Sequence, residues 1–96
     1  MKREDVLDTA KQYVSRDRNA QYDEPERNFE RIAQMWNVVL KPAMERGEFN
    51  AHEVATAMAC VKLSRIVTSP ESNDHWIDLA GYAACGAECV HDEGDS

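Results

Sequence analysis

The segment 51–68 carries apolar side chains on almost every side of the helix that its sequence predicts. Such a helix has no polar face to turn to water, so other elements must cover it on several sides. Asn50 and Glu53 stand at the first and last positions of a capping box, and Ser69-Pro70 predicts the end of the helix. We therefore expect this segment to be the central, buried helix of the fold.

Three further helices are predicted around this segment. Apolar residues at i, i+3, i+4 and i+7 predict a helix over about 3–16, and a broad apolar stripe predicts a second helix from Pro25 to Gly47. Pro42 should kink or restart that second helix, because proline lacks a backbone donor and clashes with the preceding turn. Another helix is predicted over about 73–90. No strand-like alternation occurs, so the predicted fold class is all-α.

The chain has 96 residues, which is enough for one domain with one core. A chain this short is only marginally stable alone, so we expect a compact four-helix bundle completed by oligomerisation, most simply as a dimer. We assign residues 1–90 to a single helical domain and 91–96 to an acidic flexible tail. Three cysteines, an odd number, suit a reduced cytoplasmic compartment better than a disulfide framework.

The charge balance is acidic, with 11 Lys+Arg against 18 Asp+Glu and a net charge of −7. This argues against binding of a long nucleic acid, which requires a concentrated basic surface, but leaves room for one small anionic ligand. The N-terminus has no apolar signal core, and Lys62 and Arg65 interrupt the longest apolar stretch. We therefore expect no membrane span and a cytoplasmic location.

Two pairs of carboxylates stand at helical i, i+4 spacing: Glu26 with Glu30, and Asp74 with Asp78. Each pair places two oxygen ligands on one helix face, about one turn apart. Two such helices meeting face to face would gather four carboxylates, which suits Mg²⁺ or Mn²⁺. The alternative is a surface role, because acidic residues are favoured in first helical turns by the helix dipole.

Lys62 and Arg65 lie one turn apart on the otherwise apolar segment 51–68. Each needs an anion nearby, because burial of an unpaired charge is costly. One interpretation is an internal ion pair with Asp74 or Asp78. The other is a phosphate contact, in which Arg65 offers forked donors and Lys62 a point charge. The two can coexist, and both predict that Asp78 lies within ion-pair reach of Lys62 or Arg65, directly or through a ligand.

Several stretches, covering most of residues 15–88, resemble a known family when read in order. They are Arg18-Asn19-Ala20-Gln21-Tyr22-Asp23-Glu24-Pro25-Glu26, Asn28-Phe29-Glu30-Arg31-Ile32-Ala33 with Trp36, Val54 with Met58, Lys62-Leu63-Ser64-Arg65, and Asp74-His75-Trp76-Ile77-Asp78-Leu79-Ala80-Gly81-Tyr82. Together they are similar to small phage and bacterial proteins related to the MazG-like, all-α nucleoside-triphosphate pyrophosphohydrolases.

The resemblance implies a helical oligomer with a nucleotide site between helices. The residues it assigns are Glu26, Glu30, Asp74 and Asp78 to Mg²⁺ or Mn²⁺, Lys62 and Arg65 to phosphate, and Arg18 with Tyr22 to closure of the nucleotide pocket. MazG-like enzymes carry Glu-x-x-Glu and Glu-x-x-Asp, whereas both pairs here are one residue longer. That difference rotates one carboxylate of each pair by about 100° around the helix axis.

Three functions remain open from the sequence. The first, which we favour, is Mg²⁺-dependent hydrolysis of a nucleoside phosphate by metal-activated water. The second is a non-catalytic phage protein that binds and sequesters a nucleotide signal of host defence in the host cytoplasm. The third is a structural or inhibitory helical protein without a ligand.

Overall fold

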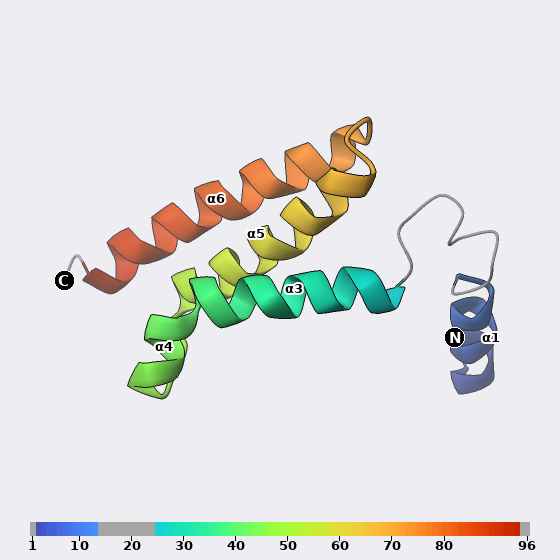
Figure 1. Cartoon of the computed structure of the whole chain (residues 1–96), viewed down its shortest axis with the longest axis horizontal. Coiled ribbons are helices and arrows are strands. Elements are labelled where there is room, and N and C mark those ends of the chain that lie inside the picture. The colour runs from blue at the N-terminus through green and yellow to red at the C-terminus, as the bar shows by residue number, and fades with distance from the viewer. Residues whose placement is uncertain (1, 14–24, 95–96) are drawn as a thin grey trace.

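The computed structural model describes residues 2–13 and 25–94. Within these two ranges all regular structure is helical, and no strand occurs, so the predicted all-α class is confirmed. The helices are α1 (Arg3–Tyr13), α3 (Pro25–Val39), α4 (Lys41–Arg46), α5 (Ala51–Thr68) and α6 (Asn73–Gly94), as Figure 1 shows.

The helices α5 and α6 form an antiparallel hairpin (Figure 1). The capping box predicted at the start of α5 is present, and the backbone N–H of Asn50 donates to the Glu53 carboxylate at 2.8 Å. At the other end the N–H of Ser69 donates to the Arg65 carbonyl at 2.9 Å. In the loop between α5 and α6, the Trp76 indole N–H donates to the Pro70 carbonyl at 2.9 Å. Local capping thus fixes both ends of α5 where the sequence predicts them.

Helix α5 packs against α6 and also against α3, so the expectation that it is the central helix is confirmed (Figure 1). The expectation that it is buried on several sides is wrong for the single chain, because Val54, Leu63 and Val67 are 54%, 43% and 68% exposed. The Trp36 indole N–H on α3 donates to the Ala57 carbonyl on α5 at 2.9 Å. The buried apolar core of the described residues is small; it consists of Ile32, Leu40, Ala43, Cys60 and Ile66. The packed part of the chain is therefore the α3–α6 assembly.

The predicted restart at Pro42 is confirmed by the break between α3 and α4. Pro42 lies in the first turn of α4, where its missing N–H is needed least. The predicted end at Gly47 is also confirmed. Gly47 has a φ of 96°, a left-handed conformation, and its N–H donates to the Ala43 carbonyl at 2.9 Å.

One helix boundary differs from the sequence prediction. Helix α6 runs to Gly94, beyond the predicted end at residue 90, so residues 91–94 are helical. Helix α1 ends at Tyr13, and the rest of its predicted length lies outside the described residues. The bulky residues Trp76 and Ile77 of α6 are 50% and 64% exposed. Helix α1 stands apart from the other helices (Figure 1).

Across the described ranges, no helix combines the length and apolar character that crossing a lipid bilayer requires.

Two glycine substitutions should have opposite effects on stability. Gly47→Ala should lower the free energy of unfolding by about 1 kcal/mol, because alanine resists the left-handed conformation. Gly81→Ala should raise it by about 0.5–1 kcal/mol, because Gly81 lies inside α6 and a Cβ there meets nothing within 4 Å. Urea unfolding followed by circular dichroism measures both. Equal effects of the two substitutions would contradict the assigned backbone conformations.

Candidate functional site

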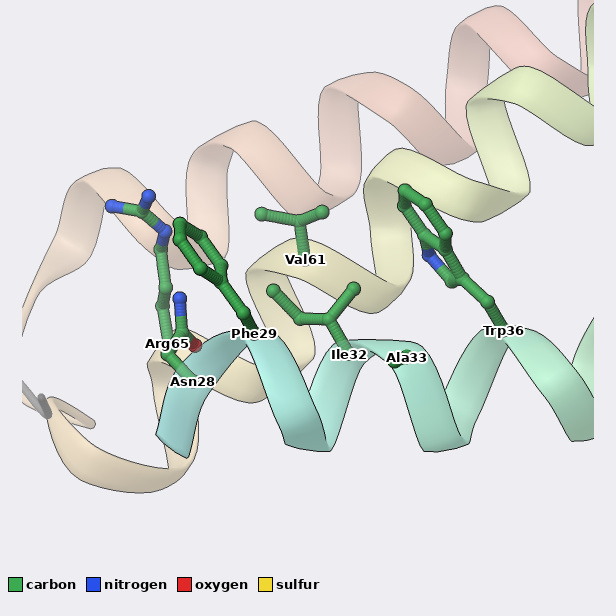
Figure 2. Close-up of a pocket in the computed structure, with 7 residues that line it drawn as sticks. All are labelled: Asn28, Phe29, Ile32, Ala33, Trp36, Val61 and Arg65. Atoms are coloured by element: carbon green, nitrogen blue, oxygen red, sulfur yellow. The ribbon is translucent and has the colours of Figure 1, made fainter. Parts of the chain in front are cut away.

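A cavity of about 310 Å³ opens between α3 and α5, at the lower end of the volume range of small-molecule sites. In Figure 2, Arg65, Asn28 and Phe29 lie toward one end of it, and Trp36 lies at the other. Ile32, Ala33 and Val61 complete the lining. The spacing of Phe29, Ile32, Ala33 and Trp36 on α3 is that of one helix face, so a single stripe supplies most of one wall.

A buried hydrogen-bond network holds α3 against α5 beside this cavity. The Arg31 guanidinium donates through Nη1 to the Ser64 hydroxyl at 3.0 Å and to its carbonyl oxygen at 3.3 Å. The Ser64 hydroxyl in turn donates to Oδ1 of Asn28 at 2.7 Å. Ser64 is 1% exposed and Asn28 is 8% exposed, so these polar groups depend on one another for partners. The network fixes Asn28 in the cavity wall.

Two aromatic rings flank the cavity. Trp36 is held by its indole hydrogen bond to α5, which fixes the orientation of its ring. Phe29 also lines the cavity and is 63% exposed, although phenylalanine is among the residue types that are most often buried. Flat ring faces available to a ligand suit the stacking of a planar group such as a nucleobase.

Arg65 supplies the cation of the cavity. Its Nε is buried and has no hydrogen-bond partner among the residues that the structure describes. A buried N–H without an acceptor is destabilising, and an anionic ligand in the cavity would supply one. The phosphate contact that the sequence suggests for Arg65 stays a prediction.

Lys62 has a different role, because it reaches α6. Its Nζ lies 3.0 Å from Oδ2 of Asp78, so the prediction that Asp78 is within ion-pair reach of Lys62 or Arg65 is confirmed. The Lys62 side chain is 16% exposed and that of Asp78 is 49% exposed. A pair this accessible contributes about 0–1 kcal/mol, less than the several kcal/mol expected for a buried pair. The internal-pair interpretation therefore describes Lys62, and the phosphate interpretation of Arg65 stays a prediction.

The carboxylates proposed as metal ligands lie on two helices. Glu26 and Glu30 are exposed on α3, Asp74 is exposed in the first turn of α6, and Asp78 pairs with Lys62. Nowhere in the described ranges do three or more His, Cys, Asp or Glu side chains gather as a metal site would require. The described residues of one chain therefore do not fit Mg²⁺ or Mn²⁺, and the metal site stays a prediction from the resemblance. Arg18 and Tyr22 lie outside the described residues.

His75 lies buried at the start of α6, near the two cations of α5. Burial lowers the pKa of its imidazole below the ordinary value of 6.5, and the positive charges of Lys62 and Arg65 lower it further. The carboxylates of Asp78 and Asp74 oppose this shift. The neutral imidazole is therefore favoured in the folded protein.

A second cavity, of about 280 Å³, lies between α5 and α6. No Lys or Arg is among its lining residues, which are His52, Ala55, Thr56, Ala59, Tyr82, Ala83, Gly86, Ala87 and Val90. It therefore lacks a permanent cation for phosphate, and the α3–α5 cavity is the better candidate for an anionic ligand.

The cavity uses residues to which the sequence assigned no binding role. Asn28 and Phe29 stand in a stretch that resembles the MazG-related family, and Trp36 stands in the apolar stripe of α3. The available signal was the i, i+3, i+4, i+7 repeat from Phe29 to Trp36, which a buried face would show equally well. Ser64 carried no signal beyond its polarity on an apolar helix.

Residues 5–90 match the model of one protein family, DUF6378, described as a domain of unknown function. The chain belongs to this family. Among curated relatives, the gene 55 protein of Mycobacterium phage L5 is 34% identical over 79 residues, which are 81% of this chain and 47% of the phage protein. The gene 55 protein of Mycobacterium phage D29 is 30% identical over 90 residues, 94% of this chain and 56% of the phage protein.

This DUF6378 chain spans about half the length of these two phage proteins. No solved structure matches it. The family assignment therefore supports a phage relationship, and the likeness to MazG-like pyrophosphohydrolases stays an expectation from the sequence.

Removal of the Ser64 hydroxyl should weaken the fold at the cavity. Ser64→Ala should lower the free energy of unfolding by about 1–3 kcal/mol, because Asn28 and Arg31 each lose a buried partner. The control is Thr68→Ala in the same helix, where an exposed hydroxyl is lost and the change should stay within about 0.5 kcal/mol. Chemical denaturation measures both, and equal losses would contradict the role of the network.

Stability should fall in mild acid because of His75. Between the lowered pKa in the folded protein and the ordinary value near 6.5, the unfolded chain binds more protons than the folded one. The free energy of unfolding should therefore decrease as the pH falls through that interval. His75→Gln should flatten this dependence, whereas His91→Gln, at an exposed position on α6, should preserve it. Melting temperatures measured from pH 7.5 to 5 provide the comparison.

Proposed function

We propose that this chain binds a nucleotide through its phosphate, in the cavity between α3 and α5. The observation that carries the proposal is Arg65, which lines the cavity and whose buried Nε has no acceptor among the described residues. Arginine binds phosphate oxygens through several N–H groups at once, so a phosphate would provide the missing acceptor.

The aromatic rings support a nucleotide over inorganic phosphate alone. Phe29 and Trp36 flank the same cavity, and stacking on an aromatic ring contributes about 1–3 kcal/mol per base. Asn28 adds an amide that can hydrogen-bond to a base or sugar. A net charge of −7 and a single arginine in the cavity favour a small ligand over a nucleic-acid strand.

Binding without turnover is the function that the geometry supports best. Hydrolysis by metal-activated water requires several carboxylates around one ion. The described acidic residues lie apart within a single chain, and Asp78 already has a partner. The two phage relatives are compatible with a protein that sequesters a nucleotide signal of the host. Mg²⁺-dependent hydrolysis remains the competing outcome of the test.

Self-association into a MazG-like bundle is part of the same proposal. The described chain buries few apolar side chains and leaves many large ones exposed on α3, α5 and α6. A second copy is the simplest partner that could cover them.

Arg65→Ala should weaken nucleotide binding by at least tenfold, because it removes the forked donor at the cavity wall. Isothermal titration against ribonucleoside mono-, di- and triphosphates and cyclic nucleotides, with and without Mg²⁺, measures the affinity. Lys41→Ala is the matched control: it removes one positive charge from an exposed site on α4 and should leave binding unchanged. Phe29→Ala should weaken binding of nucleotides more than of inorganic pyrophosphate.

Chromatography of the recovered ligand separates binding from turnover. Unchanged nucleotide after long incubation with Mg²⁺ or Mn²⁺ supports sequestration. Release of pyrophosphate, lost in Glu30→Gln and Asp78→Asn, would establish the hydrolase instead. Absence of binding by every nucleotide in the panel would overturn the proposal and leave a structural or inhibitory protein.

A further inference from the structure

Two hydrogen bonds mark the length of the cavity between α3 and α5. The Ser64 hydroxyl donates to Asn28 at one end, and the Trp36 indole N–H donates to the Ala57 carbonyl at the other. These partners are eight positions apart on α3 and seven positions apart on α5, which corresponds to about 10–12 Å along both helix axes. With a volume of about 310 Å³, a cavity of this length suits a small ligand such as one mononucleotide.

The polar side chains of the cavity lie at one end. Arg65 and Asn28 lie toward that end in Figure 2 together with Phe29, and Trp36 lies at the opposite end. The Trp36 indole N–H is already used by the bond to α5, so Trp36 offers a ligand its ring and no donor. Three apolar residues complete the lining: Ile32, Ala33 and Val61. A ligand with its charge at one end and a flat ring at the other matches this distribution.

The charge of the lining limits the charge of the ligand. Among the described residues that line the cavity, Arg65 is the one that is charged at neutral pH. Two neighbouring cations are engaged elsewhere: Lys62 pairs with Asp78 at 3.0 Å, and Arg31 donates to Ser64. One guanidinium balances one negative charge. A second negative charge in the cavity would have no cation among the described lining residues, which is costly where water is excluded.

The ionisation of phosphate separates the classes of nucleotide on this criterion. A phosphate monoester carries a charge of about −1.5 to −2 at pH 7, because its second pKa lies near 6. A phosphodiester carries a single negative charge, as each phosphate of a nucleic-acid backbone does. A triphosphate carries more charge and is usually bound together with Mg²⁺, for which the described residues gather no group of three or more His, Cys, Asp or Glu side chains. The phosphodiester therefore matches the cavity best.

We propose that the ligand is a cyclic mononucleotide, whose phosphodiester binds Arg65 and whose base stacks on the ring of Trp36. The inference rests on the proposed nucleotide binding and narrows its ligand class. Ring closure turns the phosphate into a diester without adding a second nucleoside, so both the charge and the size suit the cavity. The closed ring also leaves fewer bonds to immobilise on binding, which lowers the entropic cost.

Matched nucleotides test the charge criterion with base and sugar held constant. For each of the common bases, isothermal titration compares the 3′,5′- and 2′,3′-cyclic monophosphates with the 5′-monophosphate and the 5′-triphosphate, with and without Mg²⁺. For at least one base, a cyclic form should bind the wild-type chain about tenfold more tightly than the 5′-monophosphate does, because its single charge is fully paired. The triphosphate should bind more weakly still.

A second cation in the cavity should weaken this preference. Ala33→Lys places one at an exposed lining position of α3, so the affinity for the 5′-monophosphate relative to the cyclic form should rise about tenfold. Gln34→Lys is the matched control: it adds the same charge at the next exposed position, which does not line the cavity, and should leave the ratio unchanged. If Ala33→Lys fails to fold, the comparison of nucleotides on the wild-type chain still decides.

The position of the base has a measurement of its own. The chain has two tryptophans, so Trp76→Phe leaves Trp36 as the sole tryptophan. Stacking of a base on Trp36 should change its fluorescence with the same dissociation constant that titration gives for the cyclic mononucleotide. Inorganic phosphate, which has no ring to stack, is the control and should leave the fluorescence unchanged.

The outcomes separate this inference from the proposed function. Binding of no nucleotide would overturn both. A 5′-monophosphate or 5′-triphosphate that binds at least as tightly as every cyclic form would overturn the cyclic ligand and leave the proposed nucleotide binding intact. Binding of a cyclic mononucleotide with unchanged Trp36 fluorescence would overturn the stacking on Trp36.

Discussion

The hydroxyl group of Ser64 determines how α3 lies on α5, because it is buried and binds α3 residues on two sides. It accepts from Arg31 and donates to Asn28, so a shift of α3 along α5 would break both bonds at once. Loss of a hydrogen-bond partner in the interior costs more free energy than the bond contributes when it is made. The two bonds therefore make this register of α3 on α5 specific. The cavity depends on that register: Asn28 lines it, and the α3 stripe that follows forms the wall facing Val61 and Arg65.

The two cations of α5 lie toward different neighbouring helices, α6 and α3. Lys62 and Arg65 are three residues apart, which separates them by about 60° around the helix axis. That angle is enough for Lys62 to reach Asp78 on α6 while Arg65 lines the cavity beside α3. One charge is thus paired within the fold, and the other borders the cavity. Both charges also act on His75, whose lowered pKa results from burial and from this pair of cations.

The sequence predicted helices well where local chemistry sets their ends. The Asn50 capping box, Pro42 and Gly47 each specify a boundary through their own backbone and side-chain bonds. The cavity was harder to predict, because an apolar stripe containing Phe29 does not tell a buried face from a ligand-binding one. Regular i, i+4 spacing of acidic residues likewise says nothing about whether two helices meet, and the described acidic residues do not gather.

The proposed ligand site and the exposed apolar side chains of α6 lie on different helices, and this separates their energetics. The cavity is built by α3 and α5, whereas Trp76 and Ile77 lie exposed on α6. A nucleotide that binds only the folded chain stabilises it by mass action, whether or not α6 has a partner. The proposed self-association would act on the same folding equilibrium if it covered Trp76 and Ile77, which the chain alone leaves exposed. Helix α5 lies between the two regions: Ser64 joins it to α3 through a buried hydrogen-bond network, and Lys62 joins it to α6 through Asp78.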